Sequence, residues 1–244
     1  MPRDTQKGYD IYFEDFHGDL IPDELASTSD TGTVTVNVGL TGNKAVGSSI
    51  LRLDNSNNTD NDMIEVDTGH TSYRVSDGHL YFEARVAPHD VSVMAVNVGF
   101  HDETTESGNS LPVELSGTTW TSTAGEWIGF VFDADATTDN WYVFWVDDNN
   151  DTSVAIATLQ SDIALADTTW YTLRCDLHDA GSGNQVVAEF SVQDENGNHW
   201  EYRNTSTIDR DAALSFHIGN ELRASVDNGS LDVDYIEVGK SRVA

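Results

Sequence analysis

Glu65 and Asp67 are the residues whose types and spacing come nearest to catalytic chemistry. They lie two positions apart in residues 65–70, Glu-Val-Asp-Thr-Gly-His. A retaining glycoside hydrolase needs two carboxyl groups about 5 Å apart across the scissile bond. Residues 68–70, Thr-Gly-His, add no further carboxylate after this pair. We therefore interpret Glu65 and Asp67 as structural residues on a solvated strand face, and we expect no catalytic residue and no enzyme.

Other patterns that carry chemistry are incomplete. The eight histidines show no His-x-His or His-Glu-x-x-His spacing suited to zinc, and there is no Gly-x-Ser-x-Gly elbow or Gly-rich phosphate loop. Residues 147–151 place carboxylate and amide oxygens as a calcium loop does, but the glycine and glutamate that complete an EF-hand are missing. We interpret residues 147–151 and 54–62 as solvated turns. We assign no metal ligands from the sequence, and Ca²⁺ is the one cofactor that we consider.

The charge balance indicates the salt concentration in which the protein works. The chain has 42 acidic and 12 basic residues, a formal net charge of −30, and lysine only at positions 7, 44 and 240. At molar salt the Debye length falls to roughly 3 Å, so the repulsion between like charges is mostly screened. We interpret the protein as halophilic, with an acidic protein of ordinary salt as the alternative. Direct binding of nucleic acid is excluded, because no basic stripe can be assembled.

The composition also bears on the compartment and on domain organisation. No window approaches the roughly 18 apolar residues of a membrane span, and residues 1–8 lack the apolar core of a signal peptide. We expect neither membrane insertion nor conventional secretion. The single cysteine, Cys175, alternates with apolar residues and is predicted to lie in the core. Without any linker-like stretch, we predict an N-terminal arm, 1–11, and one domain, 12–244.

Apolar and polar residues alternate with period two from one end of the chain to the other. The clearest cases are residues 80–86, 171–177, 186–192 and 214–218. This period is typical of antiparallel strands with one wet face. Clusters of Gly, Asn and Asp separate the alternating segments, as tight hairpin turns require. The sequence therefore predicts an all-β chain.

Residues 141–146, Trp-Tyr-Val-Phe-Trp-Val, differ from the other predicted strands because both faces of this strand are bulky and apolar. One face belongs in the core, and something must cover the other. A long loop, another subunit and a ligand groove are the alternatives. Trp141 and Trp145 are the candidate residues for contact with a subunit or a glycan.

The order of the segments resembles the concanavalin A-like, laminin-G-like jelly-roll sandwich. The resemblance is carried by residues 12–18, 77–86 and 96–102, by the aromatic hairpin around 141–146, and by residues 231–238. It implies an antiparallel two-sheet sandwich in which the first and last strands pair. Proteins of this fold include lectins, glycoside hydrolases, adhesion modules, and capsid decoration and turret proteins of tailed viruses, so the fold alone does not give the function.

Four of the twelve cations lie near the two ends of the chain: Arg3, Lys7, Lys240 and Arg242. If the first and last strands pair, these charges meet at one pole of an acidic sandwich. We predict that this pole docks the protein on an acidic partner. The alternative is stray charge on unfolded tails.

Together these features favour a non-enzymatic structural virion protein, a capsid decoration or turret component of a tailed virus that infects a halophile. We expect a homo-oligomer on the capsid surface, bound to a major capsid protein or other virion protein and assembled in the host cytoplasm. The protein would then also be placed to contact glycans of the host surface. The alternative is a carbohydrate-binding, lectin-like module.

Overall fold

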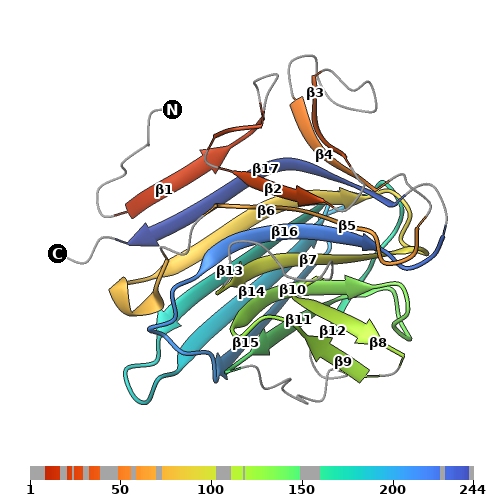
Figure 1. Ribbon diagram of the computed structural model, residues 1–244. Helices are drawn as coiled ribbons and strands as arrows, with labels where there is room; N and C mark the ends of the chain where they lie inside the picture. Colours follow the sequence, from red (N-terminus) through yellow and green to blue (C-terminus); the bar gives the residue numbers. More distant parts are fainter. Residues whose placement is uncertain are drawn as a thin grey trace.

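The computed structural model describes residues 9–16, 21–23, 25–29, 33–38, 49–55, 59–69, 73–102, 111–117, 119–148, 160–225 and 229–241. These residues form strands β1 to β17 and one 3-10 turn, Val75–Asp77. The predicted all-β, antiparallel sandwich is confirmed (Figure 1). Within the described residues, no helix has the length and apolar character needed to cross a membrane.

One layer, the back sheet, has the strand order β15-β14-β13-β6-β17-β4-β3, with β1 also beside β17. Its strands are β1 (Tyr9–Glu14), β3 (Thr33–Val38), β4 (Ser49–Asn55), β6 (Leu80–Pro88), β13 (Tyr171–Asp179), β14 (Val186–Asp194), β15 (His199–Ser206) and β17 (Gly229–Ser241). The predicted pairing of the first and last strands is confirmed, because Tyr9 lies opposite Ser241 and Glu14 lies opposite Ile236.

The other layer, the front sheet, has the order β12-β11-β10-β7-β16-β5-β2. Its strands are β2 (Ala26–Ser29), β5 (Met63–Asp67), β7 (Met94–His101), β10 (Trp127–Asp133), β11 (Asn140–Val146), β12 (Gln160–Ala164) and β16 (Ser215–Leu222). A separate hairpin, β8 (Val113–Ser116) and β9 (Thr119–Ser122), is drawn beside β10 to β12 in Figure 1.

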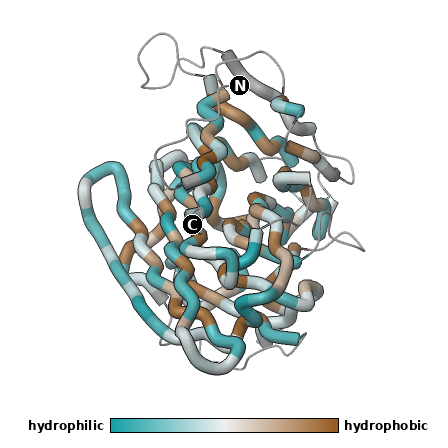
Figure 2. Tube along the Cα trace, turned by 90° about the vertical axis from the view of Figure 1, so that its left-hand side faces the viewer, coloured by the Kyte–Doolittle hydropathy of each residue, from teal (hydrophilic) through white to brown (hydrophobic). Residues whose placement is uncertain are grey.

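The core lies between the sheets and is rich in aromatic rings. Phe82 of β6 contacts two rings of the front sheet, Phe100 at 5.4 Å and Phe216 at 5.1 Å between ring centroids. Cys175 is fully buried in the same cluster, as the alternation predicts. Figure 2 shows hydrophobic and hydrophilic residues alternating along the strands. The inner faces of the two sheets therefore form the main apolar core.

The outer face of β10 and β11 is covered by the β8–β9 hairpin. The Trp120 ring of β9 lies 5.4 Å from the Tyr142 ring and 6.0 Å from the Phe144 ring. Of the alternatives for covering the aromatic strand, the chain's own loop is therefore confirmed. The choice of Trp141 and Trp145 as contact residues is wrong, because they face the core and are 0% and 4% exposed. The residues on the outer face are their neighbours in the strand.

Candidate functional site

The outer face of the back sheet carries an extended network of charged hydrogen bonds. The guanidinium of Arg174 on β13 donates to both carboxylate oxygens of Asp176, at 2.7 and 2.8 Å, and to Glu83 of β6 at 3.3 Å. Glu83 also accepts a hydrogen bond from the Tyr235 hydroxyl at 2.7 Å, and Nε2 of His79 lies 2.9 Å from Asp176. The network spans three adjacent strands, so its polar groups are held in fixed positions.

Arginine is concentrated on this face. Of the eight Lys and Arg residues that lie in the described segments, four extend from the outer face of the back sheet, and each is paired with a carboxylate. The pairs are Arg52 with Asp232, Arg85 with Asp234, Arg174 with Asp176, and Arg203 with Glu189. The guanidinium fork fits a carboxylate in a planar, bidentate way, which an ammonium group does not. This face therefore combines both charge signs on an otherwise acidic molecule.

An open pocket of about 520 Å³ lies within this network, over β13, β14 and β15. We call it the back-sheet pocket. Its volume lies within the range of small-molecule sites. Strand register places Glu201 opposite Ser191 and Arg203 opposite Glu189, so these side chains share the outer face. The pocket is lined by Arg174, Asp176, Glu189, Phe190, Ser191, Glu201, Tyr202 and Arg203.

The pKa values of this network favour fixed charges. Burial would raise the pKa of Asp176, but hydrogen bonds from His79 and Arg174 outweigh it and lower that pKa to about 2. The hydrogen bond to Asp176 raises the pKa of Arg174. Burial, together with the hydrogen bond to Glu83, raises the pKa of Tyr235. These groups therefore keep one protonation state across the neutral range, with Asp176 and Arg174 charged and Tyr235 neutral.

Aromatic rings flank the charged groups. Phe13 of β1 is 47% exposed, the one large hydrophobic side chain that is exposed among the described residues. Its ring stacks on Tyr235 at 6.0 Å between centroids. The Arg174 guanidinium lies over the Tyr81 ring at 4.5 Å. Rings beside fixed polar groups offer an apolar surface together with hydrogen-bond partners.

A second pocket, of about 480 Å³, lies where loops of both sheets meet, and its lining is acidic. Glu126 accepts hydrogen bonds from the backbone N–H groups of Asp148 and Asp209, each at 3.2 Å. Burial raises the pKa of Glu126 to about 7 and also raises the pKa of Asp147. Among the described residues, no three acidic, histidine or cysteine side chains are arranged to hold a metal ion. A Ca²⁺ site stays a prediction.

The raised pKa of Glu126 predicts how stability depends on pH. Its folded pKa of about 7 exceeds the ordinary 4.5, so between these values the folded state binds more protons and stability falls as pH rises. We expect Glu126→Gln to reduce this fall by about 1 kcal/mol between pH 5 and 8, allowing for solvent screening. Urea unfolding at both pH values measures the difference. The same exchange at exposed Glu195 is the control, and an equal slope in both variants would contradict the assignment.

The outer face of the front sheet holds a buried acid–histidine cluster. Glu65, Asp67, His101 and His217 are all 0% exposed, so the interpretation of Glu65 and Asp67 as residues of a solvated face is wrong. Nδ1 of His217 lies 3.3 Å from Oε2 of Glu65, and the rings of His217 and His101 are 4.9 Å apart. Burial, and then His101, lower the pKa of His217 well below its ordinary value, so this imidazole is neutral.

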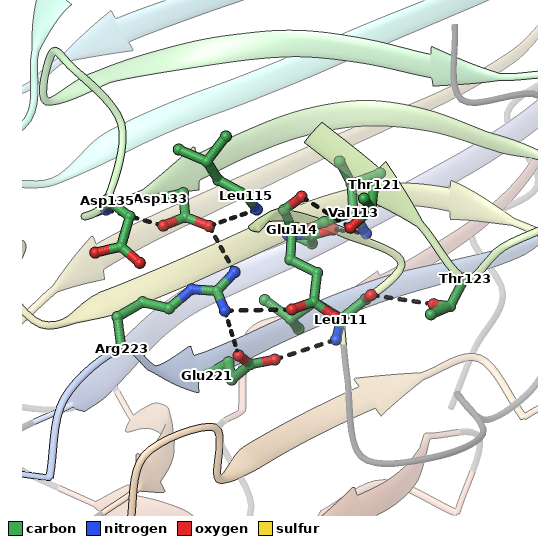
Figure 3. A network of polar contacts seen from close by, with 11 residues as sticks. Leu111, Val113, Glu114, Leu115, Thr121, Thr123, Asp133, Asp135, Glu221 and Arg223 are labelled. Atoms are coloured by element: carbon green, nitrogen blue, oxygen red, sulfur yellow. Dashed lines mark hydrogen bonds and ion pairs between the residues drawn. The ribbon is translucent and has the colours of Figure 1, made fainter. Parts of the chain in front are cut away.

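Arg223 joins the hairpin segment to the front sheet (Figure 3). Its side chain, only 6% exposed, contacts Asp133 at 2.6 Å, Glu221 at 2.7 Å and Glu114 of β8 at 3.3 Å. Asp133 also accepts the backbone N–H of Leu115 at 2.9 Å. Burial raises the pKa of Glu221 to about 7, although Arg223 opposes this shift. The network therefore fixes the hairpin over the sheet through buried charges.

The structure places only part of the predicted docking pole. Nζ of Lys240 lies 2.6 Å from Oδ2 of Asp77, in an exposed ion pair. Arg3, Lys7 and Arg242 lie outside the described residues. Docking through these four cations stays a prediction.

Sequence reasoning missed both polar networks on the sheet faces. Arg174 and Asp176 are two positions apart on one strand, which does place them on the same face. Their partner Glu83 lies on β6, far away in sequence, and is brought close by the pairing of β6 with β13. His217 and Glu65 likewise meet only through the pairing of β16 with β5. The one available signal was charged residues at alternate positions of apolar strands.

Comparisons with known proteins agree with this architecture. No family model and no curated protein matches the chain. Among solved structures, a protein of unknown function from Shewanella oneidensis MR-1 superposes with a TM-score of 0.62 at 13% identity, covering 97% of this chain and 88% of its own.

Two further structures have names that state a function. Peanut lectin superposes with a TM-score of 0.60 at 10% identity, covering 97% of this chain and 99% of the lectin. A marine alginate lyase from Aplysia kurodai gives 0.53 at 10% identity, covering 90% and 89%. At these identities the likeness establishes the fold, the concanavalin A-like jelly-roll sandwich, and no function.

Proposed function

We propose that the protein binds neutral glycans at the back-sheet pocket. The observation that carries this proposal is the fixed array of carboxylates and guanidinium groups that lines the pocket. Sugar hydroxyls both donate and accept hydrogen bonds. They can therefore bind to a pocket lining in which carboxylate acceptors lie beside guanidinium donors. Because Arg174 and Arg203 are already paired with carboxylates, the pocket offers no free cation to an anionic sugar.

Two further features support the proposal. Phe13 and Tyr235 lie on the same outer face, outside the lining of the pocket, and offer further ring surface to the apolar side of a sugar. Peanut lectin has the same fold, and by its name it is a lectin. The proposal thus favours the lectin-like alternative. The role as a capsid decoration or turret protein and the homo-oligomer stay predictions, because none of the described contacts bears on them.

A double variant at the rim of the pocket tests the proposal. Wild-type protein is screened on a panel of neutral glycans in about 2 M salt, where surface charges are screened. Glu201 and Arg203 are exposed, so we expect Glu201→Gln with Arg203→Gln to leave the fold intact. Binding should weaken at least tenfold, which is about 1.4 kcal/mol. The affinity is measured by isothermal titration calorimetry.

Arg210→Gln is the matched control, because Arg210 pairs with Asp179 outside the pocket. It should bind as the wild type does. Absence of binding by the wild type to every neutral glycan, or equal affinity of the double variant, would refute the proposal.

A further inference from the structure

The acid–histidine cluster contains hydrogen-bonding atoms that the described residues leave unused. Both ring nitrogens of His217 and Nε1 of Trp127 are buried and have no hydrogen-bond partner among the described residues. An unsatisfied buried polar group costs about 1–3 kcal/mol. Two such groups in one cluster are unfavourable for stability alone, which points to a functional role.

The surroundings of His217 suit a general base. Its Nδ1 lies 3.3 Å from Oε2 of Glu65, a contact that does not meet hydrogen-bond geometry, and the nearby negative charge favours the tautomer with the proton on Nδ1. The lone pair of a neutral imidazole then resides on Nε2. A histidine with a carboxylate beside Nδ1 and a free lone pair on Nε2 resembles the pair that activates a hydroxyl group or water in hydrolases, where the two groups are hydrogen-bonded. The other titratable groups of the cluster are His101 on β7 and Asp67 on β5.

Trp127 supplies the complementary group. Its indole N–H is a donor only, and its ring lies edge-to-face with the His217 ring at 5.8 Å between centroids. A donor without an acceptor, close to a base and out of water, is suited to stabilise the negative oxygen that forms during acyl transfer.

Access to this site depends on Leu111. A Cβ atom at Gly219 would lie 2.8 Å from both Nε2 of His217 and Cδ2 of Leu111, so the leucine covers the base above a glycine. Leu111 begins the segment that leads into β8, and its N–H donates to Glu221 at 3.3 Å. A substrate could reach Nε2 only if Leu111 moved away from it.

We propose that His217, Glu65 and Trp127 form a site that hydrolyses carboxylic esters, namely O-acyl groups on glycans, where the glycan part rests on the proposed function. Nε2 of His217 takes a proton from water as the water oxygen bonds to the ester carbonyl carbon. The carbonyl electron pair moves to its oxygen, which accepts the indole N–H of Trp127. Collapse breaks the bond to the sugar oxygen, which receives the proton from His217. A carboxylic acid and a free sugar hydroxyl result, and Glu65 acts as a positioning residue.

Ester hydrolysis by the full chain in molar salt tests the proposal. The probes are p-nitrophenyl acetate and acetylated xylan, with nitrophenolate and acetate as the products measured. His217→Gln should lower the rate about a hundredfold or more, the usual contribution of a general base. Glu65→Gln should lower the rate and move its acid limb to lower pH, because loss of the carboxylate disfavours the imidazolium. His89→Gln, outside the cluster, should leave the rate unchanged.

A second variant covers the case in which His217→Gln does not fold. Trp127→Phe keeps the ring and removes the donor, and we expect a rate loss of at least tenfold, a smaller effect than removal of an oxyanion-hole donor usually gives. Wild-type rates in both variants, or no hydrolysis of either ester by folded wild-type protein, would overturn the site. Hydrolysis of p-nitrophenyl acetate alongside failure of the glycan-binding assay would retain the esterase site and overturn only its glycan specificity.

Discussion

Replacing Arg223 with alanine is expected to lower the free energy of unfolding by about 3–5 kcal/mol at pH 8, the usual result of breaking a buried charge network. The reason is that Asp133 and Glu221, both 0% exposed, would lose the cation that compensates them. At pH 5 the loss should be smaller, since Glu221 has a pKa of about 7 and is then protonated. Urea unfolding at the two pH values measures the effect.

Arg203→Ala is the control for this experiment. Arg203 is 70% exposed and its partner Glu189 is 46% exposed, so we expect a change of at most about 1 kcal/mol. Equal destabilisation by the two replacements, or a loss at Arg223 that does not vary with pH, would contradict the buried network as the attachment of the hairpin.

Gly129→Ala is expected to destabilise the front sheet by about 3 kcal/mol, the upper part of the usual range for overpacking. A Cβ atom at Gly129 would lie 2.6 Å from Cα of Gly99 and would also meet the carbonyl oxygen of Val98. These are backbone atoms of β7, so the two central strands would have to separate. Thermal unfolding followed by circular dichroism gives the loss.

Gly117→Asn provides the comparison for the glycine experiment. Gly117 has a φ of +65° and nothing within 4 Å of an added Cβ atom. Asparagine tolerates this left-handed backbone better than other residues, so a change of at most about 0.5 kcal/mol is expected. If Gly129→Ala were as mild as Gly117→Asn, steric contact between β10 and β7 would not explain the glycine.

The alternation of side chains predicted the strands well where one face of the sheet is polar. β13 and β14 are examples, since the predicted segments 171–177 and 186–192 lie inside Tyr171–Asp179 and Val186–Asp194. The period follows directly from strand geometry, so it depends on local sequence alone. The same period did not predict how β5 is buried. Glu65 was expected on a solvated strand face, but it is fully buried, because what covers that face depends on tertiary structure.

The aromatic strand β11 also shows what the sequence alone does not predict, namely which face of the strand points into the core. Two apolar faces correctly indicated that both are covered, yet nothing in the strand itself distinguishes Trp141 from Tyr142 as the inward residue. Register with β10, which pairs Phe130 with Val143, decides the matter. The esterase site was beyond sequence reasoning for a related reason, because His217 and Glu65 reside on strands that are distant along the chain.

The position of β17 has a consequence for how the chain folds during synthesis. This last strand pairs with β6 along one edge and with β4 and β1 along the other, so it is central to the back sheet. On the ribosome, β1, β4 and β6 are synthesised long before β17, and the edges that pair with β17 remain unpaired until then. Closure of such distant contacts is slow. Until β17 is made, the edges of β1, β4 and β6 that it will cover are therefore open to pairing with other chains.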